Sequence, residues 1–396
     1  MFTTSQKNTI LLKLAEKLEQ RSGEIIAANG RDREAYPDRN ASMKDRLTTD
    51  EGKIASMAES LRQVAALPDP EGKVLYAFTR EDGLRIENRT VPFGTILIIY
   101  ESRPDVTIEA AATAFKAGNR ILLKGGKEAR HTNLQLAALW REALVEEHID
   151  ENYITYLDLS HDETQRLIRE NSRHIDLIIP RGGEGLIRFV RENTSIPLLI
   201  SGRGNNFLFA DRDCDWRMVI DIVLNGKSRV SVCNALDKVL IDEQLPDISA
   251  KLATLMDALT EKGIHVTGDA AVHRLYPAIT QETDAGVLSQ EFLSPRLYIA
   301  TASDTQDAIE TINRYSGGHS AAIVTNRGEQ ADAFMQQVDC AAVYQNASTR
   351  FTDGGQFGVG AEIAISTQKL HFRGPLGAQE LVTNKWFVYG NGHTRI

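Results

Sequence analysis

Cysteine is scarce in this chain, and positive charge is not in excess. Only Cys214, Cys233 and Cys340 occur among the 396 residues, and no C-x-x-C pair is present. Such an odd, sparse set argues against a disulfide framework and against structural zinc. The formal net charge is -9 at pH 7. This argues against a nucleic-acid-binding protein, which needs a basic face, although a local cluster of Arg and Lys can still bind a small anion.

Long apolar runs and common catalytic motifs are also missing. No apolar stretch approaches the ~20 residues that span a bilayer, and the polar N-terminus carries no secretory signal. We therefore expect a cytoplasmic protein with reduced thiols. The sequence contains no H-E-x-x-H, no P-loop and no G-x-S-x-G, and its nine histidines lack metal-ligand spacing. We predict that it binds no metal.

The first half of the chain alternates between strand and helix patterns after a helical start over residues 10–26. An Asp-Gly pair at 82–83 separates two alternating segments and predicts a hairpin over residues 75–90. Gly118 stands just after the predicted helix over residues 106–116, where a C-cap glycine is typical. The predicted strands cover residues 96–100, 120–124, 153–157 and 175–179, and the predicted helices cover residues 106–116, 133–145, 163–171 and 186–192. This pattern is typical of a doubly wound α/β domain.

A second α/β pattern follows residues 207–209. Its predicted strands cover residues 238–241, 297–300, 321–324 and 342–344, and its predicted helices cover residues 216–224, 245–261, 305–315 and 330–338. The stretch 346–360 then shows no periodicity and is rich in glycine and polar residues. A long structureless stretch in a compact enzyme is more often functional than idle.

Cys233 is the candidate nucleophile. Lys227, Arg229, Ser231 and Asn234 stand near it in the sequence. A neighbouring positive charge raises the fraction of a thiol that is ionised. Taken alone, however, a cysteine is more often a small buried hydrophobe, so both interpretations stay open.

Two glycine-rich strings are candidates for anion binding. Residues 181–185 (RGGEG) stand between a predicted strand and a predicted helix, where backbone N–H groups can approach an anion. The alternative is a tight turn. Residues 202–207 (GRGNNF) come close to the dinucleotide-binding motif G-x-G-x-x-G but end in Phe, so we give them little weight.

Two arginine-containing segments are further candidates. Arg103 follows the strongest predicted strand, at the end where α/β sheets place ligands, and it could hold a carboxylate or phosphate. The same segment also fits a helix start with Asp105 as its N-cap. Residues 346–358 combine hydroxyls, an amide, Arg350 and glycines, which fits either an anion-binding loop or an ordered surface loop.

Several long strings, in order, resemble the γ-glutamyl phosphate reductases, a branch of the aldehyde dehydrogenase superfamily. The similarity covers about residues 90–386. The strings are YESRPDVT (100–107), LKGGKEA (123–129), IPRGG (179–183), VCNA (232–235), the run 346–360, STQKLH (366–371) and RGP (373–375).

The resemblance implies an aldehyde-dehydrogenase-like α/β fold with a Rossmann-like cofactor domain, an α/β catalytic domain and a small β oligomerisation element. We expect the cofactor domain over residues 1–210, interrupted by the hairpin, and the catalytic domain over 211–345. Residues 346–380 would form an active-site loop and return to the cofactor domain. Residues 75–90 and 381–396 would form the oligomerisation element, pairing across a dimer.

The resemblance also implies the roles of individual residues, with NADPH as the cofactor. Cys233 would be the nucleophile, Lys124 would contact the adenosine ribose side of NADPH, and Glu291, in QEFLSP (290–295), would hold the nicotinamide ribose. The other expected cofactor contacts are Ser102, Gly125, Gly182 and Gly183. The expected substrate contacts are Arg103, Asn346, Arg350 and Thr352.

Two departures from the wider superfamily are informative. Hydrolytic members carry a Glu-Leu-Gly-Gly-Lys string whose glutamate activates water, and the matching stretch here begins with Leu199, which cannot be a general base. This favours exchange of a thioester with phosphate over hydrolysis. Many members also supply an oxyanion-hole Asn after the strand corresponding to residues 96–100, where this chain has Asp105, a poor donor when ionised. The Cys233 backbone N–H is one candidate donor.

The resemblance predicts NADPH-dependent reduction of γ-glutamyl phosphate to glutamate semialdehyde through a Cys233 thioester, the second step of proline synthesis from glutamate. It implies a homodimer or higher homo-oligomer, and glutamate 5-kinase is a further candidate partner. Two alternatives stay open. One is a related dehydrogenase or acyl-phosphate reductase for another amino acid, and the other is a catalytically silent partner of the kinase.

Overall fold

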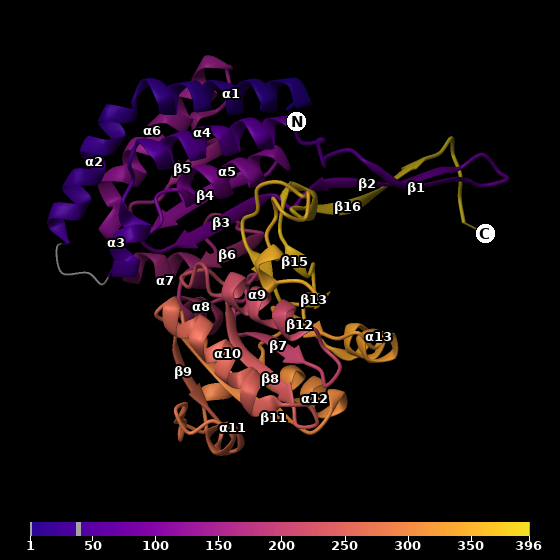
Figure 1. The fold of residues 1–396 in the computed structure, drawn as a ribbon. Helices are drawn as coiled ribbons and strands as arrows, with labels where there is room; N and C mark the ends of the chain where they lie inside the picture. The colour runs from indigo at the N-terminus through magenta and orange to yellow at the C-terminus, as the bar shows by residue number, and fades with distance from the viewer. Residues whose placement is uncertain (1, 37–40, 396) are drawn as a thin grey trace. The chain divides into compact units, whose positions relative to one another are not determined.

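The computed structural model describes residues 2–36 and 41–395 (Figure 1). Residues 1 and 37–40 of the expected cofactor domain and residue 396 of the expected oligomerisation element lie outside the described residues. The chain forms two compact units. Unit 1 comprises Met1–Ile200, Gly358–Ala364 and Leu376–Ile396, and unit 2 comprises Ser201–Phe357 and Ile365–Pro375.

Unit 1 is built on a four-stranded sheet in the order β5-β4-β3-β6, with all neighbouring strands parallel. Its strands are β3 (Thr95–Tyr100), β4 (Arg120–Gly125), β5 (Ile154–Tyr156) and β6 (Leu177–Arg181). Its helices are α1 (Thr4–Gln20), α2 (Ser22–Ala35), α3 (Ala41–Leu47), α4 (Glu51–Ala66), α5 (Val106–Lys116), α6 (Arg130–Glu146), α7 (His161–Glu170) and α8 (Glu184–Asn193).

Apolar side chains cover β3 on both faces, as expected for a central parallel strand. Ile96, Ile98 and Tyr100 belong to a core shared with α1, α4, α5 and α6, whereas Leu97 and Ile99 belong to a second core shared with α7 and α8. Successive residues of a strand point to opposite faces, so an uninterrupted apolar run fits burial on both sides. The predicted doubly wound α/β domain is therefore confirmed.

Local capping matches the sequence in most of unit 1 and differs at two points. Gly118 ends α5 at φ 81°, in the left-handed region that glycine adopts without strain. The helix expected over residues 10–26 is two helices, α1 and α2, because Arg21 leaves the helical conformation at ψ 22°. Asp105 does occupy the N-cap position of α5, but its side chain makes no capping hydrogen bond.

A three-stranded antiparallel arm belongs to unit 1. It consists of β1 (Val74–Thr79), β2 (Arg85–Pro92) and β16 (Val382–Tyr389), in the order β1-β2-β16. The β1–β2 hairpin around Gly83 is the one predicted. Figure 1 shows β16, at the yellow end of the chain, lying along the purple hairpin. All six residues of β1 are exposed.

Unit 2 is built on a seven-stranded parallel sheet in the order β10-β9-β11-β8-β7-β12-β13. Its strands are β7 (Asn206–Ala210), β8 (Leu236–Asp242), β9 (His265–Gly268), β10 (Thr280–Gln281), β11 (Arg296–Ala302), β12 (Ser320–Val324) and β13 (Ala342–Gln345). Its helices are α9 (Trp216–Gly226), α10 (Ile248–Glu261), α11 (Ala270–Leu275), α12 (Thr305–Tyr315) and α13 (Gly328–Gln337). A two-stranded antiparallel ribbon, β14 (Ile365–Ser366) and β15 (Gly374–Pro375), completes it.

The second α/β pattern is thus confirmed, with two differences. We expected the first domain to run to residue 210, but unit 2 begins at Ser201, because β7 is a strand of the second sheet. The short elements β9, α11 and β10 were not predicted. They are two to six residues long, too short for a periodic pattern to identify.

Lys7 joins helix α1 to the segment between α4 and β1 inside unit 1, and its removal should destabilise the fold. Its side chain is fully buried, and Nζ donates to Asp69 Oδ1 at 3.0 Å and to Glu71 Oε2 at 2.7 Å. Lys7→Met leaves two mostly buried carboxylates without their cation, so we expect the free energy of unfolding to fall by about 3–5 kcal/mol.

Urea denaturation would measure this change. Lys13→Met is the matched control on the same helix, because Lys13 pairs with Glu147 at the surface, and we expect it to leave the transition nearly unchanged. Equal midpoints for the two variants would contradict the assigned role of Lys7.

Candidate functional site

The carboxyl ends of β3, β4 and β6 lie at one edge of the sheet in unit 1. Tyr100 pairs with Gly125 on one side and with Arg181 on the other. The chain runs from β3 outward to β4 and β5 and then returns to the other side of β3, so a topological switch lies between β3 and β6. Ligands of doubly wound sheets bind at such a point. Except for Glu291, the expected cofactor contacts gather at this edge: Ser102, Lys124, Gly125, Gly182 and Gly183.

Ser102 and Gly125 pack the loops of this edge, whereas Lys124 brings a positive charge to it. Ser102 has a φ of 41°, and its N–H and Oγ both donate to Glu128 Oε1, at 2.8 and 2.7 Å. A Cβ on Gly125 would lie 2.2 Å from Asn133 Nδ2. Lys124 Nζ donates to the carbonyl of Gly125 at 2.7 Å, and burial lowers the pKa of Lys124.

The glycine turn before α8 holds an anion that belongs to the protein itself. The Gly183 N–H donates to Glu101 Oε2 at 2.9 Å, and a Cβ on Gly182 would lie 2.4 Å from the same oxygen. A carboxylate is favourable at a helix N-terminus. The turn therefore presents its N–H to a carboxylate, as the sequence suggested. A ligand phosphate at this point has to displace the exposed Glu101.

Arg103 belongs to a charged group at the start of α5. Burial, and next the charge of Asp105, raise the pKa of Glu109 to about 7, while Arg181 and Arg103 act in the opposite direction. The positive charge of Arg103 therefore acts on a carboxyl group of its own unit. Its contact with substrate stays a prediction.

The groups at this edge fit a dinucleotide. They comprise a lysine ammonium, a backbone N–H at the start of a helix and a topological switch point, which are the features that parallel α/β sheets use to hold a pyrophosphate and a ribose.

Cys233 lies at the amino edge of the sheet in unit 2. It occupies the loop between α9 and β8, three residues before β8 begins, and it is partly exposed. The parallel strands β7, β11 and β12 begin at the same edge. Ligands of parallel α/β sheets usually bind at the carboxyl ends of the strands, so this rule does not predict a site at the amino edge.

The segment before β7 fixes the backbone of Cys233. A Cβ on Gly204 would lie 1.9 Å from the Cys233 carbonyl oxygen, so only glycine fits there. Asn206 Nδ2 donates to the carbonyls of Cys233 and Ala235, both at 2.7 Å. Sequence reasoning missed both roles. The G-x-G string was visible, but its glycine serves close packing rather than a phosphate.

Asn234 ties the Cys233 loop to the stretch 349–352. Its Nδ2 donates to the carbonyls of Arg350 and Thr352 at 3.1 and 3.0 Å, and its Oδ1 accepts from Arg350 Nη1. Thr349 Oγ1 donates to the Asn234 carbonyl at 2.9 Å. The structure therefore brings the predicted loop and the predicted nucleophile together.

The guanidinium of Arg350 is electrostatically coupled to the thiol. Burial, and next Arg229, lower the pKa of Arg350, whereas Asp353 and the Cys233 thiolate raise it. By reciprocity, the Arg350 cation favours the ionised thiol. Arg350 is thus placed to stabilise a thiolate or an anion bound beside it.

Asn346 and Thr352, two of the expected substrate contacts, make hydrogen bonds to the protein framework, and their contact with substrate stays a prediction. Asn346 follows β13 at the carboxyl edge of the sheet, opposite the edge that carries Cys233, and its side chain bonds the N–H and carbonyl of Thr325 at 3.0 and 3.1 Å. Thr352 is fully buried, and its hydroxyl bonds Ser320 Oγ and Tyr344 Oη, both at 2.7 Å. The polar side chains of these two residues hold the loop.

Glu291 lies beside the Cys233 loop. Its Oε1 accepts the N–H of Gly204 at 3.0 Å, and Gly204 in turn packs against Cys233. Of the residues expected to serve the chemistry, unit 2 therefore groups Cys233, Arg350 and Glu291.

The other thiols are poor nucleophiles. All three cysteines are free, and burial raises the pKa of both Cys214 and Cys340 to about 11. Across residues 2–36 and 41–395, no cluster of three or more His, Cys, Asp or Glu side chains is arranged to hold a metal ion. Within the same ranges, no helix has the length and apolarity needed to cross a membrane.

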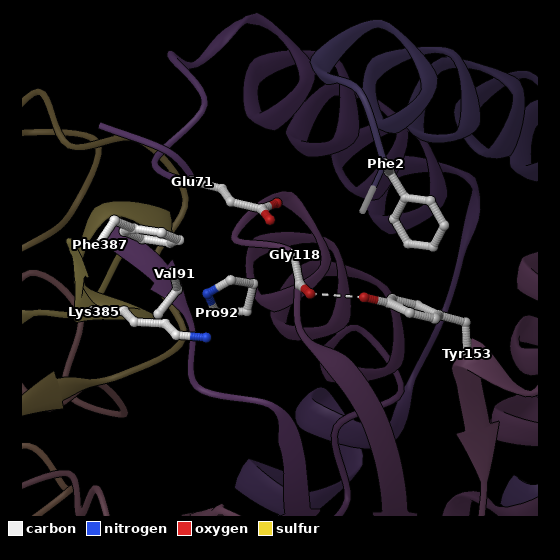
Figure 2. A pocket seen from close by; sticks show the side chains of 8 residues that line it. All are labelled: Phe2, Glu71, Val91, Pro92, Gly118, Tyr153, Lys385 and Phe387. Carbon is white, nitrogen blue, oxygen red and sulfur yellow. Dashed lines mark hydrogen bonds between the residues drawn. The ribbon is translucent and has the colours of Figure 1, made fainter. Parts of the chain in front are cut away.

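A cavity of about 410 Å³ lies at the amino edge of the sheet in unit 1 (Figure 2). It is lined by Phe2, Glu71, Val91, Pro92, Gly118, Tyr153, Lys385 and Phe387. Tyr153 Oη donates to the Gly118 carbonyl at 2.7 Å, drawn as a dashed line in Figure 2, and Glu71 pairs with Lys7. The cavity lies at the edge opposite the one that carries Lys124 and is separate from the candidate cofactor site.

Comparison with known proteins shows which family and which proteins this chain is similar to. The profile of the aldehyde dehydrogenase family matches residues 2–271 and 263–361. A gamma-glutamyl phosphate reductase of Clostridium botulinum is 42% identical over 396 residues, covering 99% of this chain and 95% of that protein. One of Geobacillus thermodenitrificans is 43% identical over 399 residues, covering 100% and 95%.

Solved structures agree on the fold. The crystal structure of gamma-glutamyl phosphate reductase from Thermotoga maritima superposes with a TM-score of 0.94 at 40% identity, covering 100% of this chain and 95% of that one. An acetylating aldehyde dehydrogenase from Geobacillus thermoglucosidasius superposes with a TM-score of 0.70 at 16% identity, which shows a common fold alone. The predicted aldehyde-dehydrogenase-like fold is confirmed.

Gly204→Ala should displace the Cys233 loop, because the new Cβ overlaps the Cys233 carbonyl. We expect the rate of Cys233 alkylation by iodoacetamide at pH 8 to change at least severalfold and stability to fall by about 1–3 kcal/mol. At this pH, Cys214 and Cys340, with pKa values of about 11, stay protonated and contribute little. Gly328→Ala is the control, since a Cβ there meets no atom within 4 Å. Identical alkylation rates in the two variants would refute the contact.

Proposed function

Because the chain belongs to the aldehyde dehydrogenase family, and its relatives at about 42% identity over the full length are gamma-glutamyl phosphate reductases, we propose that it reduces γ-glutamyl phosphate to glutamate semialdehyde with NADPH. This is the second step of proline synthesis from glutamate. The observation that carries the proposal is Cys233, partly exposed and held between Gly204 and the Asn234–Arg350 pair.

Cys233 performs the first chemical step. Its thiolate attacks the acyl carbon, a carbon–sulfur bond forms, and the carbon–oxygen bond to phosphate breaks. Phosphate leaves with the bonding electrons and takes a proton from water. Arg350, whose guanidinium interacts with the charge of Cys233, is proposed to favour the thiolate before the attack and to hold the departing anion.

The nicotinamide cofactor, when bound, supplies a hydride to the carbonyl carbon of the thioester. Lys124, Ser102 and the glycine turn at 182–183 would hold the cofactor, and Glu291 would contact its nicotinamide ribose. Cys233 then leaves as a thiolate when the tetrahedral centre collapses to the aldehyde, so the nucleophile is regenerated without a further proton transfer. NADPH is proposed over NADH because the γ-glutamyl phosphate reductases, which the sequence resembles, use NADPH. Lys124 also offers a cation at the carboxyl edge of the sheet in unit 1.

Phosphate, rather than water, is proposed to resolve the thioester in the reverse direction. Leu199, which stands where hydrolytic relatives carry their general base, is buried and cannot activate water. This supports acyl-phosphate chemistry over oxidation of an aldehyde to a free acid.

The reverse reaction tests the proposal, because acyl phosphates decompose in water. Glutamate semialdehyde, phosphate and NADP should give an increase in nicotinamide absorbance that requires phosphate. Cys233→Ser should lower the rate at least about a thousandfold while NADPH binding persists. Cys214→Ser is the control and should keep the wild-type rate. Turnover that is equal with and without phosphate, or substantial turnover of Cys233→Ser, would overturn the mechanism.

We further propose that the arm mediates self-association. Tyr76, Phe78, Ile86, Trp386 and Val388 share one face of its three strands, since Asn88 pairs with Tyr76 and Trp386, and Ile86 pairs with Phe78 and Val388. The side chains of Tyr76, Phe78, Trp386 and Val388 are 49–55% exposed. An exposed apolar face beside an unpaired edge strand fits a second copy of the chain. An association with glutamate 5-kinase stays a prediction.

Phe78→Asp should therefore convert an oligomer into a monomer, because a carboxylate would be buried in the contact. Thr79→Asp is the matched control on the same strand, since Thr79 is also exposed but, as the direct neighbour of Phe78 in the regularly paired part of β1, lies on the opposite face. Size-exclusion chromatography with light scattering would measure the masses. A monomeric wild type, or an unchanged mass for Phe78→Asp, would rule the proposal out.

A further inference from the structure

Two neighbouring charged residues of β8 fix the backbone on both sides of Glu291. Lys238 Nζ donates to the carbonyl of Gln290 at 2.7 Å. Asp237 Oδ2 accepts the N–H of Phe292 at 2.7 Å. Glu291 lies between these two contacts, so its position follows from β8.

The same two side chains also reach the segments that hold Cys233. Lys238 Nζ donates to Asn205 Oδ1 at 2.9 Å, and Asn205 stands between Gly204 and Asn206, which contact the Cys233 backbone. Asp237 Oδ1 accepts from Lys227 Nζ at 2.9 Å, and Lys227 directly precedes the loop that carries Cys233. The two residues therefore connect Glu291 with the surroundings of the nucleophile.

The placement of these charges is costly for stability alone. Asp237, Lys238 and Lys227 are 2%, 0% and 5% exposed, in and beside a strand whose seven residues are all buried. Buried charges cost free energy unless they are fully paired, and apolar residues of similar volume often stabilise a core as well or better. This cost favours a role in positioning over a role in stability.

Lys238 keeps its contacts in either protonation state. Burial lowers the pKa of Lys238 to about 7. A neutral amine still carries two N–H groups, so the hydrogen bonds to Gln290 and Asn205 persist. Lys238 Nζ also lies 3.6 Å from the ring centroid of Phe292, which adds a second contact to the Glu291 segment.

We propose that Asp237 and Lys238 form a positioning clamp that sets Glu291 for binding of the nicotinamide cofactor. The inference rests on the proposed function, because it takes Glu291 as the contact of the nicotinamide ribose. Both residues act through Glu291 and neither belongs to the reacting groups.

A double-mutant cycle with NADPH as the titrant tests the clamp. Lys238→Met keeps the length of the side chain but removes its donors, and we expect the Kd for NADPH to rise about tenfold, as for the loss of one buried charged hydrogen bond. Glu291→Ala should weaken binding by a similar factor. Because Lys238 acts through Glu291, the double variant should bind no more weakly than Glu291→Ala. Lys238→Arg, which keeps a cation and donors, should recover much of the affinity.

Two further measurements separate positioning from general damage. The rate of Cys233 alkylation at pH 8 should stay within about twofold in Lys238→Met, since Asn206 and Gly204 still hold the thiol loop. Lys262→Met, at an exposed position after α10, is the matched control and should match the wild type in every measurement. If Lys238→Met is insoluble, Asp237→Asn replaces it in the same cycle with the same expected result.

The outcomes are distinct. Multiplicative losses in the double variant, wild-type affinity in Lys238→Met, or a parallel loss of Cys233 reactivity would each overturn the clamp while leaving the proposed function intact. A wild-type chain that binds no NADPH would instead overturn both, and phosphate-independent turnover would overturn the proposed function alone.

Discussion

The close contact between Gly204 and the backbone of Cys233 sets the arrangement of unit 2 around Cys233. A methyl group at Gly204 cannot fit, so the segment before β7 and the loop before β8 approach as closely as two backbones allow. The Gly204 N–H donates to Glu291 Oε1 at 3.0 Å. Gly204 therefore contacts both Cys233, the candidate nucleophile, and Glu291, the carboxylate proposed to hold the cofactor. Since packed interiors yield little, a displacement at this contact reaches both groups.

The candidate cofactor contacts of unit 1 lie at the carboxyl edge of its sheet, whereas Cys233 lies at the amino edge of the sheet in unit 2. In unit 1 the candidate cofactor contacts lie at the carboxyl ends of β3, β4 and β6, where α5 and α8 begin and a backbone N–H faces the carboxylate of Glu101. In unit 2 the candidate nucleophile Cys233 precedes β8, after the C-terminus of α9. A helix C-terminus carries partial negative charge, which does not favour a thiolate. A positive charge for a thiolate would therefore come from side chains, and Arg350 is the cation that interacts with Cys233.

Buried charges recur as connectors between distant segments. Lys7 joins α1 to the segment before the arm, and Lys238 and Asp237 join β8 to the loops on either side of it in space. Each such group has a strong partner, because an unpaired buried charge is not tolerated. The benefit of these pairs is geometric. A charged hydrogen bond specifies distance and direction, whereas apolar contacts specify volume.

The sequence by itself determined the fold class and singled out Cys233 as the candidate nucleophile. The apolar run of β3, the Ala-rich α5 ended by Gly118, and the Asp-Gly hairpin depend on local periodicity and turn chemistry, which neighbouring residues decide. The strings around Cys233, Arg181 and Arg350 were distinctive enough to indicate the family. The short elements β9, α11 and β10 were missed because so few residues carry no period.

Only the tertiary structure decided which groups of the protein the polar residues of the expected site contact. Asn346 and Thr352 are polar residues of the kind that often contact ligands. Their hydrogen-bond partners are instead framework groups, which the loop meets only after folding: Thr325, Ser320 and Tyr344. Gly204 and Lys238 looked incidental in the sequence and proved to lie beside Cys233 and Glu291. The physical reason is that steric exclusion and buried hydrogen bonds depend on which distant segments meet, and a linear pattern records only which residues are neighbours along the chain.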